Sequence, residues 1–257
     1  MQPALFLGHG NPMHAISSNA YTRCWSKIGD DMPRPKGIVC ISAHWYIGGT
    51  GVTVSTHPKT IHDFGGFPQE LYQVEYPAPG DPDLAVKVQG LLAPLDVTLS
   101  ADWGLDHGTW SVLRHVYPHA DIPVVQLSIN RLESPAFHYD IGQKLACLRE
   151  QGILIVGSGN VVHNLHMASW GVASSDPYDW AVRFEALAKD IIIGGDQRDL
   201  IDYDRLGLDA ALAIPTPDHY LPLLYVLGVR HASDSVSFPV TGVDMGSISM
   251  LSVQIGG

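Results

Sequence analysis

Three short apolar runs, each followed by a histidine, constrain this chain more than any other feature of its sequence. The runs and their histidines are residues 4–7 with His9, residues 36–41 with His44, and residues 152–156 with His163. Apolar runs of this length that end near Gly or Ser are typical of buried strands. Because α/β proteins place their sites at the carboxyl ends of strands, we expect the three imidazoles to meet at one edge of a sheet.

Helical patterns separate these strands along the rest of the chain. Helices are predicted at residues 19–28, 81–92, 111–117, 134–151, 176–193 and 218–227, with a more weakly patterned one at 198–212, and two closing β runs at 235–240 and 247–255. The chain has 257 residues, of which 46% are hydrophobic, enough for one large core. We therefore expect an α/β fold in which residues 1–257 form a single domain, with a central mostly parallel or mixed sheet flanked by helices on both faces.

Charge and cysteine content exclude several classes of function. Asp and Glu number 26 against 15 Lys and Arg, so the net charge is -11 and binding to nucleic acid or to an anionic membrane surface is not expected. The three cysteines, Cys24, Cys40 and Cys147, are far apart and form no thiolate zinc motif. With no apolar run near the roughly 18 residues of a membrane span and no secretory leader, we expect a cytoplasmic protein, a monomer or a small homo-oligomer.

The candidate metal ligands are all histidines. The chain holds 13 histidines, and His219, beside Asp218 at the start of the helix expected from residue 218, joins the strand-end histidines His9, His44 and His163. Imidazoles on separate rigid elements can bind one divalent ion while neighbouring groups orient them. Such a site leaves positions open for water, oxygen or substrate, as in catalytic zinc sites and non-haem iron oxygenases.

Two further segments are candidates for the chemistry around such an ion. His107 lies in an expected loop, residues 102–110, and is either an acid, base or substrate donor, or a loop histidine that bonds the backbone. Residues 60–68 combine aromatic, glycine and polar residues without periodicity, so we expect a long loop over the site, with His62 as a possible pocket residue.

Six short motifs carry a resemblance to a known family. In chain order they are ALFLGHG at 4–10, SAHW at 42–45, IHDFGGFP at 61–68, DHGTW at 106–110, GNVVHN at 159–164 and TPDHYLPLL at 216–224. Together they resemble the class III extradiol ring-cleavage dioxygenases, the protocatechuate 4,5-dioxygenase-like family, and within it the 4,5-DOPA dioxygenase type. The resemblance covers nearly the whole chain.

This resemblance implies an enzyme that opens the ring of a catechol such as DOPA with O₂, giving a semialdehyde. It implies one divalent metal ion per chain, Fe²⁺ or Zn²⁺, with His9, His44, His163 and His219 matching the metal-binding histidines. In better-characterised relatives the residue matching His163 is instead the acid or base beside the metal, and the residue matching His107 contacts the substrate.

One departure from the family pattern concerns the last motif. Relatives have Glu where this chain has Asp218, so either Asp218 reaches the metal or His219 takes that place. Two other functions are compatible with the same residues: a zinc hydrolase that activates water at the open position, and a metal-binding protein without turnover.

Overall fold

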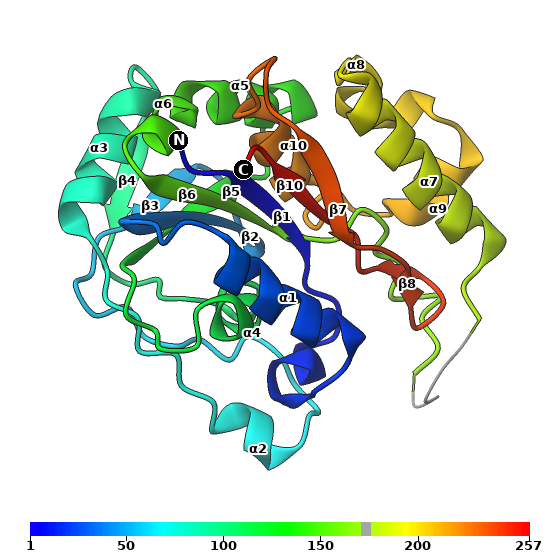
Figure 1. Ribbon diagram of the computed structural model, residues 1–257, viewed down its shortest axis with the longest axis horizontal. Helices are drawn as coiled ribbons and strands as arrows, with labels where there is room; N and C mark the ends of the chain where they lie inside the picture. The colour runs from blue at the N-terminus through cyan, green and yellow to red at the C-terminus, as the bar shows by residue number, and fades with distance from the viewer. Residues whose placement is uncertain (171–175) are drawn as a thin grey trace.

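Eight strands form one central mixed sheet in the computed structural model, which describes residues 1–170 and 176–257 (Figure 1). The strands lie in the order β4, β3, β5, β2, β6, β1, β10, β7. The four middle strands, β5, β2, β6 and β1, are parallel, whereas β10 pairs antiparallel with β1 and β3 pairs antiparallel with β5. The predicted α/β class with a mixed sheet is therefore confirmed.

The bounds of the elements follow the apolar runs of the sequence closely. The strands of the sheet are β1 (Ala4–Gly8), β2 (Gly37–Ile47), β3 (Thr50–Thr53), β4 (Val97–Ser100), β5 (Val124–Asn130), β6 (Ile153–Gly159), β7 (Val236–Val240) and β10 (Ser252–Ile255), with β8 (Val243–Asp244) and β9 (Ile248–Ser249) forming a separate hairpin. Every residue of β1, β5 and β6 is buried, because helices cover both faces of the parallel strands.

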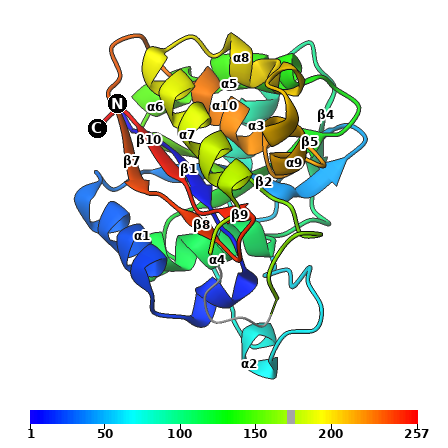
Figure 2. The same cartoon turned by 90° about the vertical axis from the view of Figure 1, so that its right-hand side faces the viewer.

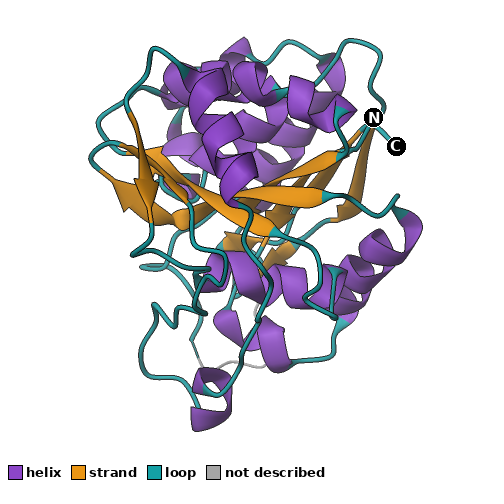
Figure 3. Ribbon diagram, turned by 90° about the vertical axis from the view of Figure 1, so that its left-hand side faces the viewer, coloured by secondary structure: helices purple, strands orange, loops and turns teal. Residues whose placement is uncertain are grey.

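Helices cover both faces of the sheet, and each face has its own hydrophobic core (Figures 2 and 3). One face carries α3 (Pro82–Leu92), α5 (Pro135–Leu145), α6 (Cys147–Glu150), α7 (Asp179–Gly194), α8 (Arg198–Ile201), η2 (Tyr203–Arg205), α9 (Leu208–Ala213) and α10 (Leu221–Gly228). The other carries η1 (Pro12–Ile16), α1 (Ala20–Asp31), α2 (Gln69–Tyr72) and α4 (His107–Val116). No helix in the described ranges combines the length and apolar character that a membrane crossing requires.

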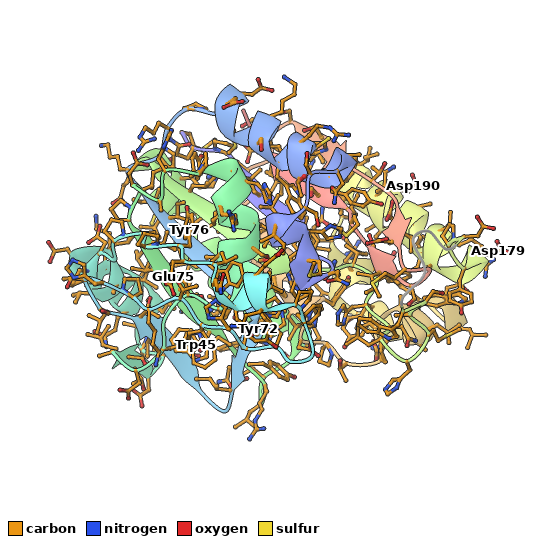
Figure 4. All side chains as sticks on the ribbon, turned by 90° about the horizontal axis from the view of Figure 1, so that it is seen from below. Trp45, Tyr72, Glu75, Tyr76, Asp179 and Asp190 are labelled. Atoms are coloured by element: carbon orange, nitrogen blue, oxygen red, sulfur yellow. The ribbon has the colours of Figure 1, made fainter. Side chains whose placement is uncertain are left out.

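A long irregular segment between β3 and α3 lies across the second of these faces. Figure 4 shows it from below, with Tyr72, Glu75 and Tyr76 labelled. Asp179 and Asp190, both on α7, lie at the other side of the molecule in the same view. The expectation of a long loop from residue 60 is confirmed, apart from the single turn of α2.

Three predicted helices begin at other residues than expected, and one of them, α10, begins at Leu221 instead of residue 218. The helix expected from residue 111 begins four residues earlier, at His107, because the side chain of Asp106 caps it by accepting a hydrogen bond from the Thr109 amide. The helix expected from residue 176 begins at Asp179, and its N-cap residue Tyr178 makes no side-chain cap bond.

Two other predicted segments are interrupted. The helix expected over residues 134–151 is divided into α5 and α6 at Ala146, whose amide bonds to the carbonyl of Gln143, three residues back. The closing β run expected over 247–255 is likewise divided, into β9 and β10. Its first part pairs with β8 rather than with the sheet.

Candidate metal centre and catalytic pocket

Three of the candidate histidines lie at the carboxyl ends of neighbouring parallel strands, as the sequence predicts. His9 follows β1 directly, and His163 follows β6 after a short turn. His44 lies inside β2, where the register against β5 shifts between Ile41 and Tyr46. Such a bulge redirects side chains, and here it belongs to the strand end that supplies an imidazole.

The other two histidines come from helix starts. His107 is the first residue of α4, so the helix rather than a loop positions it. Gly108, the next residue, lets α4 approach the sheet, because a Cβ atom there would lie 2.8 Å from Cδ2 of His44. His219 lies in a turn two residues before α10, not within the helix as expected, and its carbonyl accepts a hydrogen bond from the Asn160 amide at 2.8 Å.

All five predicted site histidines meet in one cluster. The ring centroids of His9 lie 5.1 Å from His44, 5.2 Å from His219 and 5.8 Å from His107. The His44 and His107 rings are 3.8 Å apart, and the His163 and His219 rings stack at 3.5 Å. The sheet thus brings together residues that are up to 210 positions apart in the sequence.

Carboxylates fix the orientation of three of these rings. Asp63 accepts a hydrogen bond from Nδ1 of His107 at 2.9 Å through one oxygen, and its other oxygen lies 3.2 Å from Nδ1 of His44, at ion-pair distance. Nδ1 of His219 donates to Asp218. A carboxylate can only accept, so each Nδ1 that faces one carries a hydrogen, and the neutral form of such a ring keeps its lone pair on Nε2.

His9 reaches the same tautomer through a hydroxyl. Ser158 donates its only hydrogen to the carbonyl of Gly108 at 2.5 Å, so its oxygen must accept from Nδ1 of His9, 3.0 Å away. Nε2 of His9 is therefore also unprotonated, and it lies 3.3 Å from Nε2 of His44. Two lone pairs facing each other at this distance favour a cation between them.

Burial disfavours the charged form of four of the five rings, those of His9, His44, His163 and His219. It lowers the pKa of His9 well below the usual 6.5, with further lowering by the neighbouring imidazoles, and lowers the pKa of His44 to about 3. The pKa of His219 is also lowered well below 6.5, by burial first and then by His163. Burial would raise the pKa of Asp63, but the hydrogen bonds and charge of His107 outweigh it and lower the value to about 2. A neutral imidazole is the form that binds metal.

The chemistry of the donor set therefore fits a divalent cation. One ligand atom each of His9, His44 and His219 lies within 4.8 Å of the other two. No cysteine belongs to this set, and three histidine ligands leave room for further ligands on the ion. Asp218 orients His219 from outside this set, as carboxylates commonly do for metal-binding histidines.

His163 differs from the other four rings. It stacks on His219 with an angle of 7° between the rings, and its own ring nitrogens have no hydrogen-bond partner among the described residues. Burial lowers its pKa to about 4, partly offset by the charge of Asp218. A neutral imidazole with free nitrogens can accept a proton from a molecule bound beside it.

A pocket of about 170 Å³ opens over the five histidines. Its other lining residues are mostly apolar and are Gly10, Asn11, Pro12, Phe67, Leu165, Trp170, Met245 and Ile248. Apolar walls around a few convergent polar groups are characteristic of small-molecule sites.

Sequence reasoning missed one residue and placed another differently. Asp63, which holds both His44 and His107, was not expected as a site residue. Its neighbour His62, expected as a possible pocket residue, turns away and bonds the carbonyl of Val74 at 2.9 Å. The signal for Asp63 is its place in the aromatic loop, since a lone acidic residue beside histidines is a common orienting partner.

The fold and the site define a metal-dependent enzyme of the α/β class that acts on a small, ring-sized molecule. Residues 3–247 match the family described as the catalytic LigB subunit of aromatic ring-opening dioxygenase, and the chain belongs to this family. The metal-dependent extradiol dioxygenase expected from the sequence motifs is thereby confirmed.

Known relatives cover most of the chain. The protein is 54% identical over 259 residues to a "4,5-DOPA dioxygenase extradiol" of Escherichia coli K12, an alignment that spans 99% of this chain and 94% of that relative. It is 38% identical to a protein of the same name from Beta vulgaris, over 89% of this chain and 87% of the relative. A crystal structure of an uncharacterized Escherichia coli K12 protein, JW3007, is similar with a TM-score of 0.88 at 48% identity, over 100% of both chains.

Proposed function

We propose that residues 1–257 form one catalytic domain that opens the aromatic ring of a catechol beside its two hydroxyl groups. Both atoms of O₂ enter the product, which carries a carboxylate and an aldehyde. The convergence of three unprotonated imidazole nitrogens in an apolar pocket carries this proposal. Because two relatives have 4,5-DOPA in their names, a 3,4-dihydroxyphenyl compound such as DOPA is the substrate class we propose.

We assign His9, His44 and His219 as the ligands of one Fe²⁺ ion per chain. Their Nε2 lone pairs, and the contacts of their Nδ1 atoms with Ser158, Asp63 and Asp218, support this assignment. The ion supplies a Lewis acid and a binding position for the diol and O₂. Zn²⁺ fits the same nitrogen donors, so the ligand types do not distinguish the two ions. Reconstitution with each ion tests which of them supports activity.

The remaining two histidines handle protons. His163 has free ring nitrogens and lines the pocket, so we assign it as the base that takes a hydroxyl proton from the catechol and later returns it. His107 also lines the pocket and is held by Asp63, so its Nε2 accepts a hydrogen bond from the substrate. The Asp63 carboxylate would stabilise either His107 or His44 if it gained charge.

The walls and surroundings complete the proposal. Phe67, Leu165 and Ile248 form part of the apolar wall of the pocket and would exclude water from the reacting ring. The net charge of -11 supports an enzyme with small-molecule substrates and without nucleic-acid or membrane partners. We place it in the cytoplasm, as a monomer or small homo-oligomer.

Anaerobic reconstitution tests this function. The metal-free protein is loaded with Fe²⁺ or Zn²⁺, and oxygen uptake and product absorbance are followed with L-DOPA and 4-methylcatechol. We expect the iron-loaded protein to consume one O₂ for each ring opened. His44→Ala is expected to abolish uptake, whereas His57→Ala, which removes an exposed histidine, keeps it.

Two outcomes would overturn the proposal. One is the absence of oxygen uptake with either catechol in protein that contains one Fe²⁺ ion per chain. The other is uptake that His44→Ala does not reduce. Ester or amide hydrolysis by the zinc-loaded protein without oxygen would instead support the hydrolase, and tight metal binding with neither reaction would support a non-catalytic protein.

A further inference from the structure

A second, more polar pocket adjoins the catalytic pocket. It has a volume of about 370 Å³ and shares Asn11, Trp170 and Met245 with the catalytic pocket. Its other lining residues come from η1 and α1 with their caps, from the segment after β6 and from β8, and are Met13, His14, Ser17, Asn19, Tyr21, Ser169 and Asp244. The shared residues place this second pocket directly beside the catalytic pocket.

Asp244 supplies the charge of the second pocket. It is the one acidic or basic side chain apart from histidine among the described lining residues, and its side chain is 31% exposed. One of its oxygens accepts from Nε2 of His14 at 3.2 Å and the other from the Met245 amide at 2.9 Å. Each carboxylate oxygen can accept a second hydrogen bond, so the group can still bind a donor from the pocket.

The cap of α1 fixes which nitrogen of His14 faces Asp244. The Asn19 side-chain oxygen accepts from the Thr22 amide at 3.0 Å, which turns the Asn19 amide nitrogen toward Nδ1 of His14, 2.9 Å away. An amide nitrogen only donates, so Nδ1 of His14 accepts and the Nε2 hydrogen faces Asp244. His14 therefore occupies one acceptor position of Asp244 and leaves the others open to the pocket.

Glu185 supplies a second carboxylate near Tyr21, which lines this pocket. Glu185 is buried and accepts from the Gly242 amide at 2.9 Å and from the Ser249 hydroxyl at 2.7 Å. The pKa of the Tyr21 hydroxyl is raised first by burial and then by the negative charges of Asp244 and Glu185. Neither pocket has a lysine or arginine among its described lining residues.

The boundary between the two pockets has a strained backbone. Met245 adopts φ of +51°, a left-handed conformation that costs a non-glycine residue energy, and Gly246 follows at +80°. This turn joins β8 to β9 and places Met245 in both linings while its amide holds Asp244. Strain that persists at such a place is often part of a ligand site.

We propose that the second pocket binds the ammonium group of the substrate side chain and that Asp244 determines this specificity. The substrates would be catechols with a short side chain ending in a primary amine, while a side chain with only a carboxylate would be disfavoured. This inference rests on the proposed function for the placement of the ring. It adds that the substrate side chain next to the ring carries a positive charge.

Three catechols that differ in charge test the proposal in the iron-loaded enzyme: dopamine, neutral 4-methylcatechol and 3,4-dihydroxyphenylacetate. We expect kcat/KM to fall in that order, because a hydrogen bond to a charged group commonly changes binding by about 10- to 100-fold. Asp244→Asn keeps an acceptor for the Met245 amide and is expected to lower the ratio of dopamine to 3,4-dihydroxyphenylacetate by about 10- to 100-fold, mainly through KM.

Two controls separate this inference from the proposed function. Asp199→Asn removes the same charge from an exposed site and is expected to leave the ratio unchanged. Dissociation constants for the three catechols, measured without oxygen, give the same ratio even if no ring opens. A wild-type enzyme that binds all three catechols equally, or an Asp244→Asn ratio equal to that of wild type, would overturn the inference. Failure of the iron-loaded enzyme to open L-DOPA or any of the three catechols would overturn the proposed function alone.

Discussion

Two buried polar clusters occupy opposite ends of the same sheet. At the amino ends of β1 and β6, near both chain termini in Figure 1, Arg149 is fully buried and pairs with Asp234, whose side chain is 3% exposed. Each guanidinium nitrogen has a partner: besides Asp234, carbonyls of Gln2, Val229 and Ile255 accept at 2.9, 2.7 and 3.3 Å. At the carboxyl ends, the histidines face one another with free lone pairs.

The difference shows which buried polar groups are structural and which are functional. The arginine pair satisfies its own hydrogen bonds and ties both termini to α6 and to the end of α10, so it needs nothing from outside. In the histidine cluster, Asp63, Asp218 and Ser158 contact one nitrogen each of His9, His44, His107 and His219. The ligand atoms of His9, His44 and His219 converge within 4.8 Å of one another, and this convergence marks the active site.

The largest expected effect separates roles within the histidine cluster. His163→Gln should lower kcat by about 10²- to 10⁴-fold, because it removes the proposed base. It should keep one metal ion per chain, whereas His219→Ala should lose the ion. Metal analysis after gel filtration, with oxygen uptake on the same samples, measures both.

A matched substitution completes this test. His166→Gln changes an exposed histidine three residues away and should alter neither quantity. If His163→Gln lost metal as fully as His219→Ala does, His163 would be a ligand, as the sequence motifs predict, and its assignment as the base would fail.

The second effect concerns the arginine cluster alone. Asp234→Asn leaves a buried guanidinium without its counter-charge and should lower the free energy of unfolding by about 3–5 kcal/mol, measured by urea denaturation. The kcat of the folded enzyme should not change, since the cluster lies at the other end of the sheet. Asp196→Asn breaks an exposed pair with Arg198 and should have little effect on unfolding. A stable Asp234→Asn protein with impaired turnover would contradict the division between the two clusters.

The parts of this arrangement that the sequence predicts are those set by local patterns. The apolar runs identify the strands, and the parallel sheet then brings His9, His44 and His163 together. The positions of His107 in an aromatic segment and of His219 beside Asp218 add two further candidates, which the motif resemblance supports, and all five line one pocket. Each of these predictions needs only a short stretch of sequence.

What the sequence could not predict depends on contacts between distant segments. Asp63 acts on His44 and His107 across 19 and 44 positions, and no local pattern reports such a contact. α4 begins at His107 because Asp106 caps it. The same residues are also compatible with a loop, and the sequence pattern alone does not distinguish the two. The charge of the second pocket depends on His14 and Asp244, 230 positions apart.

The smallest effect is a pH dependence that distinguishes the two clusters in the metal-free protein. Folding lowers the pKa of His44 to about 3 and that of His163 to about 4, from 6.5 in the unfolded chain. Below pH 6.5 the unfolded chain therefore binds more protons, and stability falls as the pH falls from 6.5 toward 4. Each of these histidines contributes up to about one proton to the slope.

Urea denaturation across this pH range measures the slope. His163→Gln removes one of the rings whose pKa is lowered by folding, so the fall in stability should become shallower by up to about one proton. His166→Gln should leave the slope unchanged, because that residue is exposed and lies outside the cluster. If His163→Gln and wild type lost stability in parallel, His163 would already be protonated in the folded protein at these pH values. The cluster would then not be held neutral for metal, and its contrast with the charged arginine pair would disappear.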